Sequence, residues 1–137
     1  MIVGNKIGDV LTSPERHVAF AINTEGHNDA GLAGNISDHF WPELASTGPI
    51  RMGEILSKDL GYKVFHALVV HSLIDGWSDT PQHIEACFNE LEIPTDEEIA
   101  SVAIGAGLVG ALSGANTHDN LAAMDRSNKS IVIYNFS

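Results

Sequence analysis

The chain has 137 residues, of which 44% are hydrophobic and 18% charged, and its 7 basic and 18 acidic side chains give a formal net charge of −11 at pH 7. This length predicts one domain, residues 1–137, with enough apolar content to bury a core, which excludes intrinsic disorder. The acidic balance excludes a large basic face, and with it non-specific binding to nucleic acid or to an anionic membrane.

The single cysteine and the first residues of the chain predict its compartment. Cys87 alone cannot form an intramolecular disulfide or a cysteine-based zinc site, and its apolar helical surroundings predict a buried thiol. Met1–Lys6 lacks the basic start and long apolar run of a signal peptide, and no apolar run approaches the roughly 18 residues of a membrane span. We therefore expect a cytoplasmic protein, of a cell or of a virus-infected host.

Short apolar segments alternate with longer amphipathic stretches. In chain order, the predicted elements are strands Ile2–Ile7 and His17–Asn23, helix Ala30–Phe40, short helix Glu43–Ser46, strand Lys63–Leu73, helix Thr80–Leu91, strand Ile99–Ile104, helix Asn116–Arg126 and strand Ser130–Tyr134. Buried strands that alternate with helices predict an α/β fold, with a mixed central sheet covered by helices in three α/β/α layers.

Two glycine-rich segments, Asn23–Ala33 and Gly105–Gly114, follow predicted strands. Ligands of α/β folds bind beyond the carboxyl ends of the strands, and a glycine-rich turn bares backbone N–H groups that can cradle a phosphate. Two such loops facing each other would form a cleft for a diphosphate. The alternative for each is an ordinary tight turn.

The second segment also contains a literal G-x-G-x-x-G at Gly105, Gly107 and Gly110, which on its own suggests a dinucleotide-dependent oxidoreductase. That motif needs a complete βαβ unit with an acidic residue about 20 positions further on, at the end of the second strand. Too little chain follows Gly110, and the predicted last strand ends at Asn135, which is not acidic. We therefore keep this only as a less favoured alternative.

The seven histidines suggest a metal site, but their spacing does not favour one. His66 and His71 are five residues apart on a predicted strand and should point to opposite faces unless a bulge intervenes. Asp75, Asp79 and His83 recur every four residues, but glycine and proline interrupt any helix that would align them. We expect neither a metal nor a cofactor.

In order and spacing, the motifs of this chain resemble those of a macro domain, closest to the compact terminal ADP-ribose glutamate hydrolase and ADP-ribose-1″-phosphate phosphatase types. The matching segments are Gly8-Asp9-Val10, Ala21-Ile22-Asn23 with Gly26, Ala30-Gly31-Leu32-Ala33, Phe40-Trp41-Pro42, Ile104–Gly110 and Ile131–Tyr134. The resemblance covers nearly the whole chain and implies a ligand, ADP-ribose or an ADP-ribosylated macromolecule.

The resemblance also implies ligand contacts, position by position. Asp9 would accept from the adenine amino group, helped by the Val10 backbone N–H, with Asn135 and Phe136 as neighbours of the adenine. Asn23 would contact the distal ribose. The diphosphate would lie between Gly31 with Leu32 on one side and, on the other, Gly105, Ala106, Gly107, Leu108, Val109 and Gly110.

The catalytic residues of these relatives are not matched here. The lysine and aspartate of the glutamate-hydrolase type fall on His71 and Val109, and the histidine of the phosphatase type falls on Phe20. Valine cannot move a proton, and a lone histidine on an apolar strand more often packs than reacts.

Other groups in the first loop can carry chemistry. Thr24, Glu25, His27, Asn28 and Asp29 follow one another closely there. His27 carries an imidazole, which could act as an acid or a base. Asp29 or Glu25 could activate a water at the distal ribose. With Asn23, His27 and Asp29 as catalytic candidates, we expect a hydrolase that removes ADP-ribose from a macromolecule or the 1″-phosphate from ADP-ribose. The alternative is a non-catalytic reader of ADP-ribose or a related nucleotide.

Overall fold

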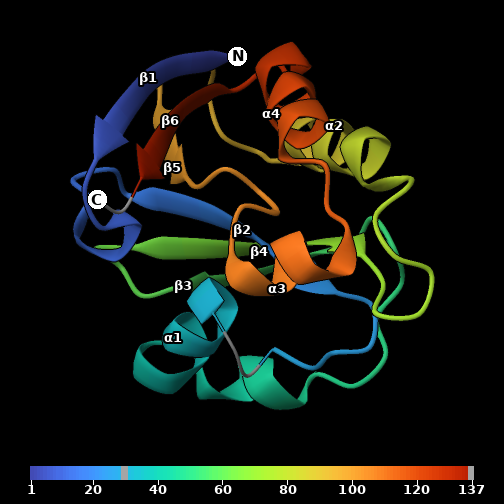
Figure 1. Cartoon of the computed structure of the whole chain (residues 1–137). Coiled ribbons are helices and arrows are strands. Elements are labelled where there is room, and N and C mark those ends of the chain that lie inside the picture. The colour runs from blue at the N-terminus through green and yellow to red at the C-terminus, as the bar shows by residue number, and fades with distance from the viewer. Residues whose placement is uncertain (29–30, 136–137) are drawn as a thin grey trace.

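The computed structural model describes residues 1–28 and 31–135 and contains a six-stranded sheet in the order β1-β6-β5-β2-β4-β3 (Figure 1). The strands are β1 (Ile2–Ile7), β2 (His17–Asn23), β3 (Ile55–Asp59), β4 (Val64–His71), β5 (Glu98–Ser101) and β6 (Ser130–Asn135). All neighbouring strands pair in parallel except β3 and β4, which are antiparallel, so the sheet is mixed.

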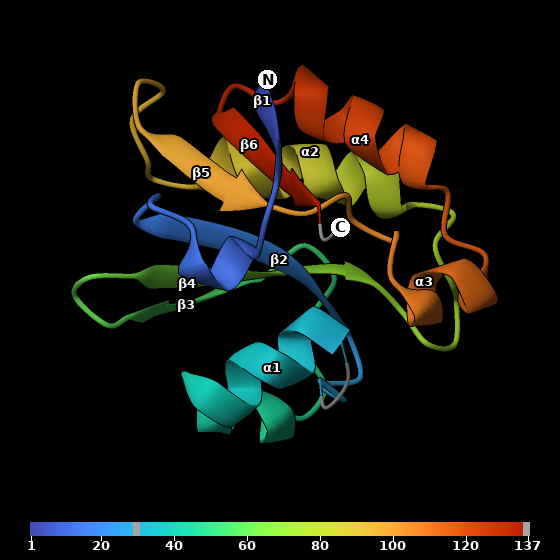
Figure 2. The same ribbon diagram turned by 60° about the vertical axis from the view of Figure 1, so that its left-hand side comes forward.

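Helices lie on both faces of the sheet (Figure 2). The helical elements are α1 (Gly31–His39), α2 (Thr80–Glu90), α3 (Leu108–Ser113), α4 (Thr117–Arg126) and the short 3-10 helices η1 (Val10–Thr12) and η2 (Pro42–Ser46). Helices α2 and α4 cover one face, and α1 with η2 covers the other, so the predicted three-layer α/β/α fold is confirmed.

Each face of the sheet has its own hydrophobic core. On the α2 and α4 side, Leu68 and Val70 of β4 pack with Ile84 and Phe88 of α2. On the α1 side, residues that alternate with these along β4 pack with α1 and η2. Because the interior strand β4, next to the edge strand β3, is buried along its whole length, it reads as a mostly apolar run in the sequence.

The sequence-predicted elements are all present, strands Ile2–Ile7 and His17–Asn23 with the predicted ends and the others with shifted ends, and three further elements appear. The predicted strand Ile99–Ile104 ends at Ser101, and Lys63–Leu73 ends at His71. Strand β3 was not predicted because Ile55–Asp59 is short, half polar and at the edge of the sheet. Helix α3 and η1 are single turns within segments that were predicted as loops. Within the described residues, no helix is long and apolar enough to cross a membrane.

The topology gathers four loops and the end of β6 in one place. Strands β1, β6, β5, β2 and β4 run in the same direction, so their carboxyl ends meet at one end of the sheet, which we call the loop end. The predicted loops that follow β2 and β5 both leave from it, as do Gly8 and Asp9 after β1. The opposite end, where β2, β4 and β5 begin, we call the amino end.

Candidate functional site

The first loop follows β2 and is closed by the side chain of Asn23. Its amide nitrogen donates to the His27 carbonyl oxygen at 2.9 Å, and its amide oxygen accepts from the His27 N–H at 3.0 Å. The Thr24 N–H donates to the His71 carbonyl oxygen at 3.0 Å, which ties the loop to β4. The structure therefore shows buried Asn23 as the closure of this loop, while the His27 side chain is exposed.

Glycines at two positions give the first loop its path. Gly26 has a φ of +76°, and a Cβ there would lie 2.2 Å from the Gly48 carbonyl oxygen, so no other residue fits. Gly31 begins α1 with a φ of +62° and is exposed. Leu32 next to it packs partly against the core on the α1 side. Asp29, a predicted catalytic residue, lies outside the described residues.

The second loop follows β5 and folds back on itself at two glycines. A Cβ on Gly110 would lie 2.4 Å from the Gly105 carbonyl oxygen, so these backbones are in direct contact. The Asn120 side chain of α4 donates to the Ile104 carbonyl oxygen at 2.9 Å and fixes the start of the loop. Close backbone packing at Gly110, and a φ of +90° with crowding by the Ala115 and Asn120 side chains at Gly105, therefore account for two of the three glycines in the G-x-G-x-x-G pattern without any ligand.

Gly107, the middle glycine of this pattern, has a different environment. It is exposed, its φ of −68° is open to any residue, and among the described residues nothing beyond its chain neighbours lies within 4 Å of its Cβ position. Ala106 is exposed as well. This part of the loop backbone is therefore open to approach from solvent. The predicted contacts Leu108 and Val109 lie on α3, and their side chains are outside the description.

At the far side of the loop end, the ends of β1 and β6 are joined. The Gly8 N–H donates to the Asn135 carbonyl oxygen at 2.8 Å, so Asn135 lies beside the segment that carries Asp9. The Asn135 side chain donates to the Asn5 side chain. The structure thus brings two of the predicted adenine neighbours together, whereas Phe136 lies outside the described residues.

Asp9 has one carboxylate oxygen engaged and one available. One oxygen accepts from the Leu11 N–H at 2.9 Å and caps η1, and the other makes no hydrogen bond to the described residues. The Val10 side chain is buried in the core on the α1 side, so only its backbone can face a ligand. Asp9 can therefore hold η1 and accept from an amino group at the same time.

The last residue of β4, His71, is packed rather than open. It is 9% exposed and stacks on Trp77, with 4.0 Å between the ring centroids and 6° between the planes. Burial lowers the pKa of His71 to about 4, against the opposing effect of the Glu25 charge, so the ring is neutral at pH 7. Its Nδ1 is buried and has no hydrogen-bond partner among the described residues.

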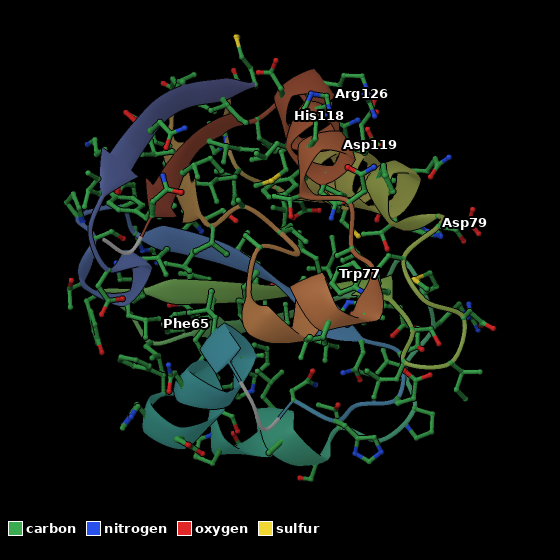
Figure 3. The ribbon with its side chains drawn as sticks, viewed as in Figure 1. Phe65, Trp77, Asp79, His118, Asp119 and Arg126 are labelled. Carbon is green, nitrogen blue, oxygen red and sulfur yellow. The ribbon has the colours of Figure 1, made fainter. Side chains whose placement is uncertain are left out.

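Trp77 connects this histidine to the second loop. Its Nε1–H donates to the Ser113 hydroxyl of α3 at 2.7 Å, and Figure 3 shows Trp77 beside that helix. The segment between β4 and α2 is thereby joined to the helix that follows Gly107. Sequence reasoning missed Trp77, since no spacing pattern connects it with either glycine-rich segment.

The expectation that His66 and His71 point to opposite faces of β4 is wrong. The pairing of β2 with β4 slips by one residue between Ile22 and Asn23, so that Asn23 pairs with His71. This bulge turns His71 to the face that carries His66, and both lie on the α2 side of the sheet. They have different partners all the same, because His66 bonds to His17 and Ser57 instead.

Glu25 uses its carboxylate to hold the neighbouring segment. It accepts from the Ser72 hydroxyl and from the Leu73 N–H, each at 2.8 Å. Slight burial raises the pKa of Glu25, but these hydrogen bonds outweigh it and leave the pKa below its ordinary value. Glu25 is therefore ionised, and its carboxylate oxygens are occupied by Ser72 and Leu73. This makes Glu25 a poor candidate for the predicted activation of a water.

Phe20, which occupies the histidine position of the phosphatase type, is a core residue. It is 1% exposed, and its ring packs edge-on against Phe65 with the centroids 6.5 Å apart. It lies on the α1 side within β2, upstream of the loop end. Neither its chemistry nor its place allows it to act on a ligand there.

Comparison with known proteins identifies the fold. No family model and no curated protein sequence matches the chain. Solved structures do: the macrodomain of Mycobacterium tuberculosis DarG is 18% identical with a TM-score of 0.69, over 100% of this chain and 99% of that one. An Oceanobacillus iheyensis macrodomain mutant described as with ADPR is 16% identical with a TM-score of 0.67, over 97% of this chain and 84% of that one. The protein therefore has the macrodomain fold, as its motifs predicted.

Proposed function

We propose that this protein binds ADP-ribose or a derivative of it along the loop end of the sheet, and that it hydrolyses the ligand at the distal ribose. The observation that carries the binding proposal is the gathering of the predicted contacts at one end of a macrodomain fold. The likeness to a macrodomain described with ADPR supports the choice of ligand.

The order of the strands supports one orientation of ADP-ribose along the loop end. Asp9 and Asn135 lie at the β1 and β6 side, and we assign the adenine to them because a free carboxylate oxygen suits an exocyclic amino donor. The β5 and β2 loops are next along the sheet, and their exposed backbone at Gly107 and Gly31 suits the diphosphate. The distal ribose then falls at the end of β2, near Asn23.

A net charge of −11 does not exclude this anionic ligand. Backbone N–H groups act over a few ångströms, whereas charges further away than about 8–10 Å are screened at physiological salt. The overall charge should slow the encounter of ligand and protein at low salt. We therefore expect affinity to rise when salt is raised from very low concentrations.

Hydrolysis requires a base, a water and a protonated leaving group. A base in the first loop takes a proton from water as the water oxygen attacks, the bond to the leaving group breaks, and the leaving oxygen gains a proton. We assign this proton transfer to His27 or Asp29. His27 has an exposed side chain. The Asn23 side chain bonds to both the N–H and the carbonyl oxygen of His27 and so fixes its backbone.

The alternative is a reader that binds ADP-ribose without turning it over. Three observations favour it: Phe20 is a core residue, His71 is a neutral ring stacked on Trp77, and Glu25 is engaged in hydrogen bonds. Phe20 has no acid or base group, and the contacts of His71 and Glu25 hold both side chains in other roles, so we expect none of the three to replace the lysine, aspartate or histidine of the catalytic types. The first loop alone then decides between enzyme and reader.

Turnover assays separate the two functions. The purified protein would be incubated with an ADP-ribosylated protein and, separately, with ADP-ribose-1″-phosphate, and the release of ADP-ribose or phosphate would be measured. The hydrolase proposal predicts release that is lost in His27→Ala or Asp29→Ala and retained in His118→Ala, an exposed histidine on α4. Binding without release from either substrate would establish the reader.

A further inference from the structure

A second group of chemically active side chains lies at the amino end of the sheet, away from all the loops described above. The Ser57 hydroxyl is 2.8 Å from His66 Nδ1, and His66 Nε2 is 2.9 Å from His17 Nδ1. His17 Nε2 is 3.2 Å from a carboxylate oxygen of Glu97. These four residues, which we call the amino-end relay, form one chain of polar contacts made of two hydrogen bonds and the contact between His17 and the Glu97 carboxylate.

The register of the strands builds this relay. Ser57 of β3 stands directly opposite His66 in the antiparallel pair, and His17 begins β2 on the same face of the sheet. The rings of His17 and His66 are stacked, with 5.1 Å between centroids and 21° between planes. Glu97 comes from the turn that precedes β5. Four segments distant in the sequence therefore converge on one line of polar atoms.

The hydrogen bonds are mutually consistent in only one direction when both histidines are neutral. The Ser57 hydroxyl donates to His66 Nδ1 and His66 Nε2–H donates to His17 Nδ1, which leaves the protonated Nε2 of His17 facing the Glu97 carboxylate. Burial, and then the charge of His17, lowers the pKa of His66 to about 4, while Asp59 opposes this. His66 is therefore neutral at pH 7, with Nδ1 as the acceptor from the serine.

A pocket lies along the relay. It has a volume of about 350 Å³, within the usual range for small-molecule sites, and includes Ser57 and both histidines in its wall. Its apolar wall is formed by Ile55, Leu91 and Ile93. The acidic side chains Glu90 and Glu92 also line it, and no lysine or arginine does. The apolar wall suits a small apolar group of a ligand. The two acidic side chains favour a ligand that is uncharged or positively charged.

We propose that this pocket is a second catalytic site, in which Ser57 accepts an acyl group from small uncharged or cationic esters. A hydroxyl within hydrogen-bond reach of an imidazole, whose other nitrogen is oriented by a further partner, is the arrangement that activates serine nucleophiles. Here His66 is the base, and His17 with Glu97 orients it. The site is independent of the proposed ADP-ribose site, since the two lie at opposite ends of the sheet.

The reaction proceeds in two steps. The Ser57 oxygen bonds to the ester carbonyl carbon while its proton passes to His66 Nδ1, and the resulting positive charge is shared with His17 and balanced by Glu97. The bond between the carbonyl carbon and the alcohol oxygen then breaks, and the alcohol leaves with the proton from His66. Water attacks the acyl-serine in the same manner, which releases the acid and restores the hydroxyl.

Two backbone groups are candidates to stabilise the oxyanion of each step. Glu92 and Ile93 line the pocket, and neither backbone N–H has a hydrogen-bond partner within residues 1–28 and 31–135. Backbone donors at such a position typically contribute a large part of the rate in acyl transfer.

The test is acylation by 4-nitrophenyl acetate at pH 7.5. We expect release of 4-nitrophenol with an initial burst, and an acetyl group that peptide mass mapping places on Ser57. Ser57→Ala should reduce the rate at least tenfold and abolish this label, whereas Ser46→Ala, at another exposed serine in η2, should leave both unchanged. Since Ser57 is exposed at the sheet edge, its replacement should leave the thermal unfolding temperature nearly unaltered.

A second variant tests the relay rather than the serine. In Glu97→Gln the size of the side chain beside His17 is kept but the negative charge is gone, so the acylation rate should fall several-fold with Ser57 still the labelled residue. Equal rates in wild type, Ser57→Ala and Glu97→Gln would overturn the proposal, as would a label on other residues only. In that case the four side chains form a structural chain of polar contacts.

Discussion

The two ends of the sheet offer two different kinds of chemistry. At the loop end, the contacts that we propose for the ligand are mostly backbone groups, in loops held by glycines at Gly26, Gly105 and Gly110 and by the amides of Asn23 and Asn120. At the amino end, the reactive atoms belong to side chains joined by hydrogen bonds. The contrast teaches that one macrodomain fold can leave loop backbone open at one end, where we propose that the ligand binds, while strand register assembles a side-chain relay at the other end.

The largest effect on the loop end should come from Gly110→Val. Its Cβ would lie 2.4 Å from a backbone oxygen of Gly105, and backbone cannot yield as a flexible side chain does. We expect loss of ADP-ribose binding together with a thermal unfolding temperature lower by several degrees. Binding and melting measurements on the same sample check both.

Gly107→Val is the matched change, because its Cβ meets open space. It should melt like the wild type and still lose ADP-ribose affinity by about tenfold or more, as its side chain would occupy the place of the diphosphate. If Gly107→Val bound normally, the second loop would be a turn without a ligand, and the contrast between the two ends would be lost.

Lowering the pH should destabilise both ends through their buried histidines. The pKa values of His66 and His71 are lowered to about 4, so between pH 6.5 and 4 the unfolded chain takes up protons that the folded chain does not. The free energy of unfolding therefore has its full value above pH 6.5. It falls as the pH approaches 4, by roughly 3 kcal/mol for each histidine. Urea unfolding at pH 7.5, 6, 5 and 4.5 measures this, and a flat profile from pH 7.5 to 5 would contradict the burial of both rings.

Asn23→Ala should weaken the first loop without affecting the amino end. It removes two hydrogen bonds to the His27 backbone, each worth about 1 kcal/mol. If the distal ribose is the reacting group, turnover should fall more than affinity, because the base is displaced. Equal losses in turnover and affinity would favour the reader, and acylation at Ser57 serves as the internal control.

The smallest effect is expected at the adenine side. Asp9→Ala should weaken ADP-ribose binding by about 1–2 kcal/mol, the scale of a charge-assisted hydrogen bond, and should also loosen η1. Asp9→Asn keeps an oxygen for the Leu11 N–H, so a binding loss with normal stability in this variant would isolate the ligand contact. Unchanged affinity in both variants would place the adenine elsewhere.

The layers of this fold were predictable because its strands and helices carry strong apolar patterns. Strand β4 is buried throughout, and every predicted strand was found. Strand β3 escaped prediction because Ser57, Lys58 and Asp59 make it polar at the exposed edge of the sheet. A bulge in the pairing of β2 with β4, which no sequence pattern shows, reversed the expected orientation of His71.

The two proposed sites differ in how far each could be predicted from the sequence. Glycines mark the first, because a positive φ or a close approach of backbones excludes other residues, as at Gly26 and Gly105. The amino-end relay depends on register: Ser57, His66 and His17 are separate in the sequence and meet only when β3, β4 and β2 align. No local sequence pattern predicts that these three side chains lie together.

The central claim, that the loop end is an ADP-ribose site, is tested most directly by calorimetric titration with ADP-ribose, using AMP and NAD as controls. The account predicts one site per chain, with micromolar or tighter affinity for ADP-ribose and much weaker binding of AMP. Undetectable binding of ADP-ribose by a folded sample, or equal binding of AMP, would contradict it.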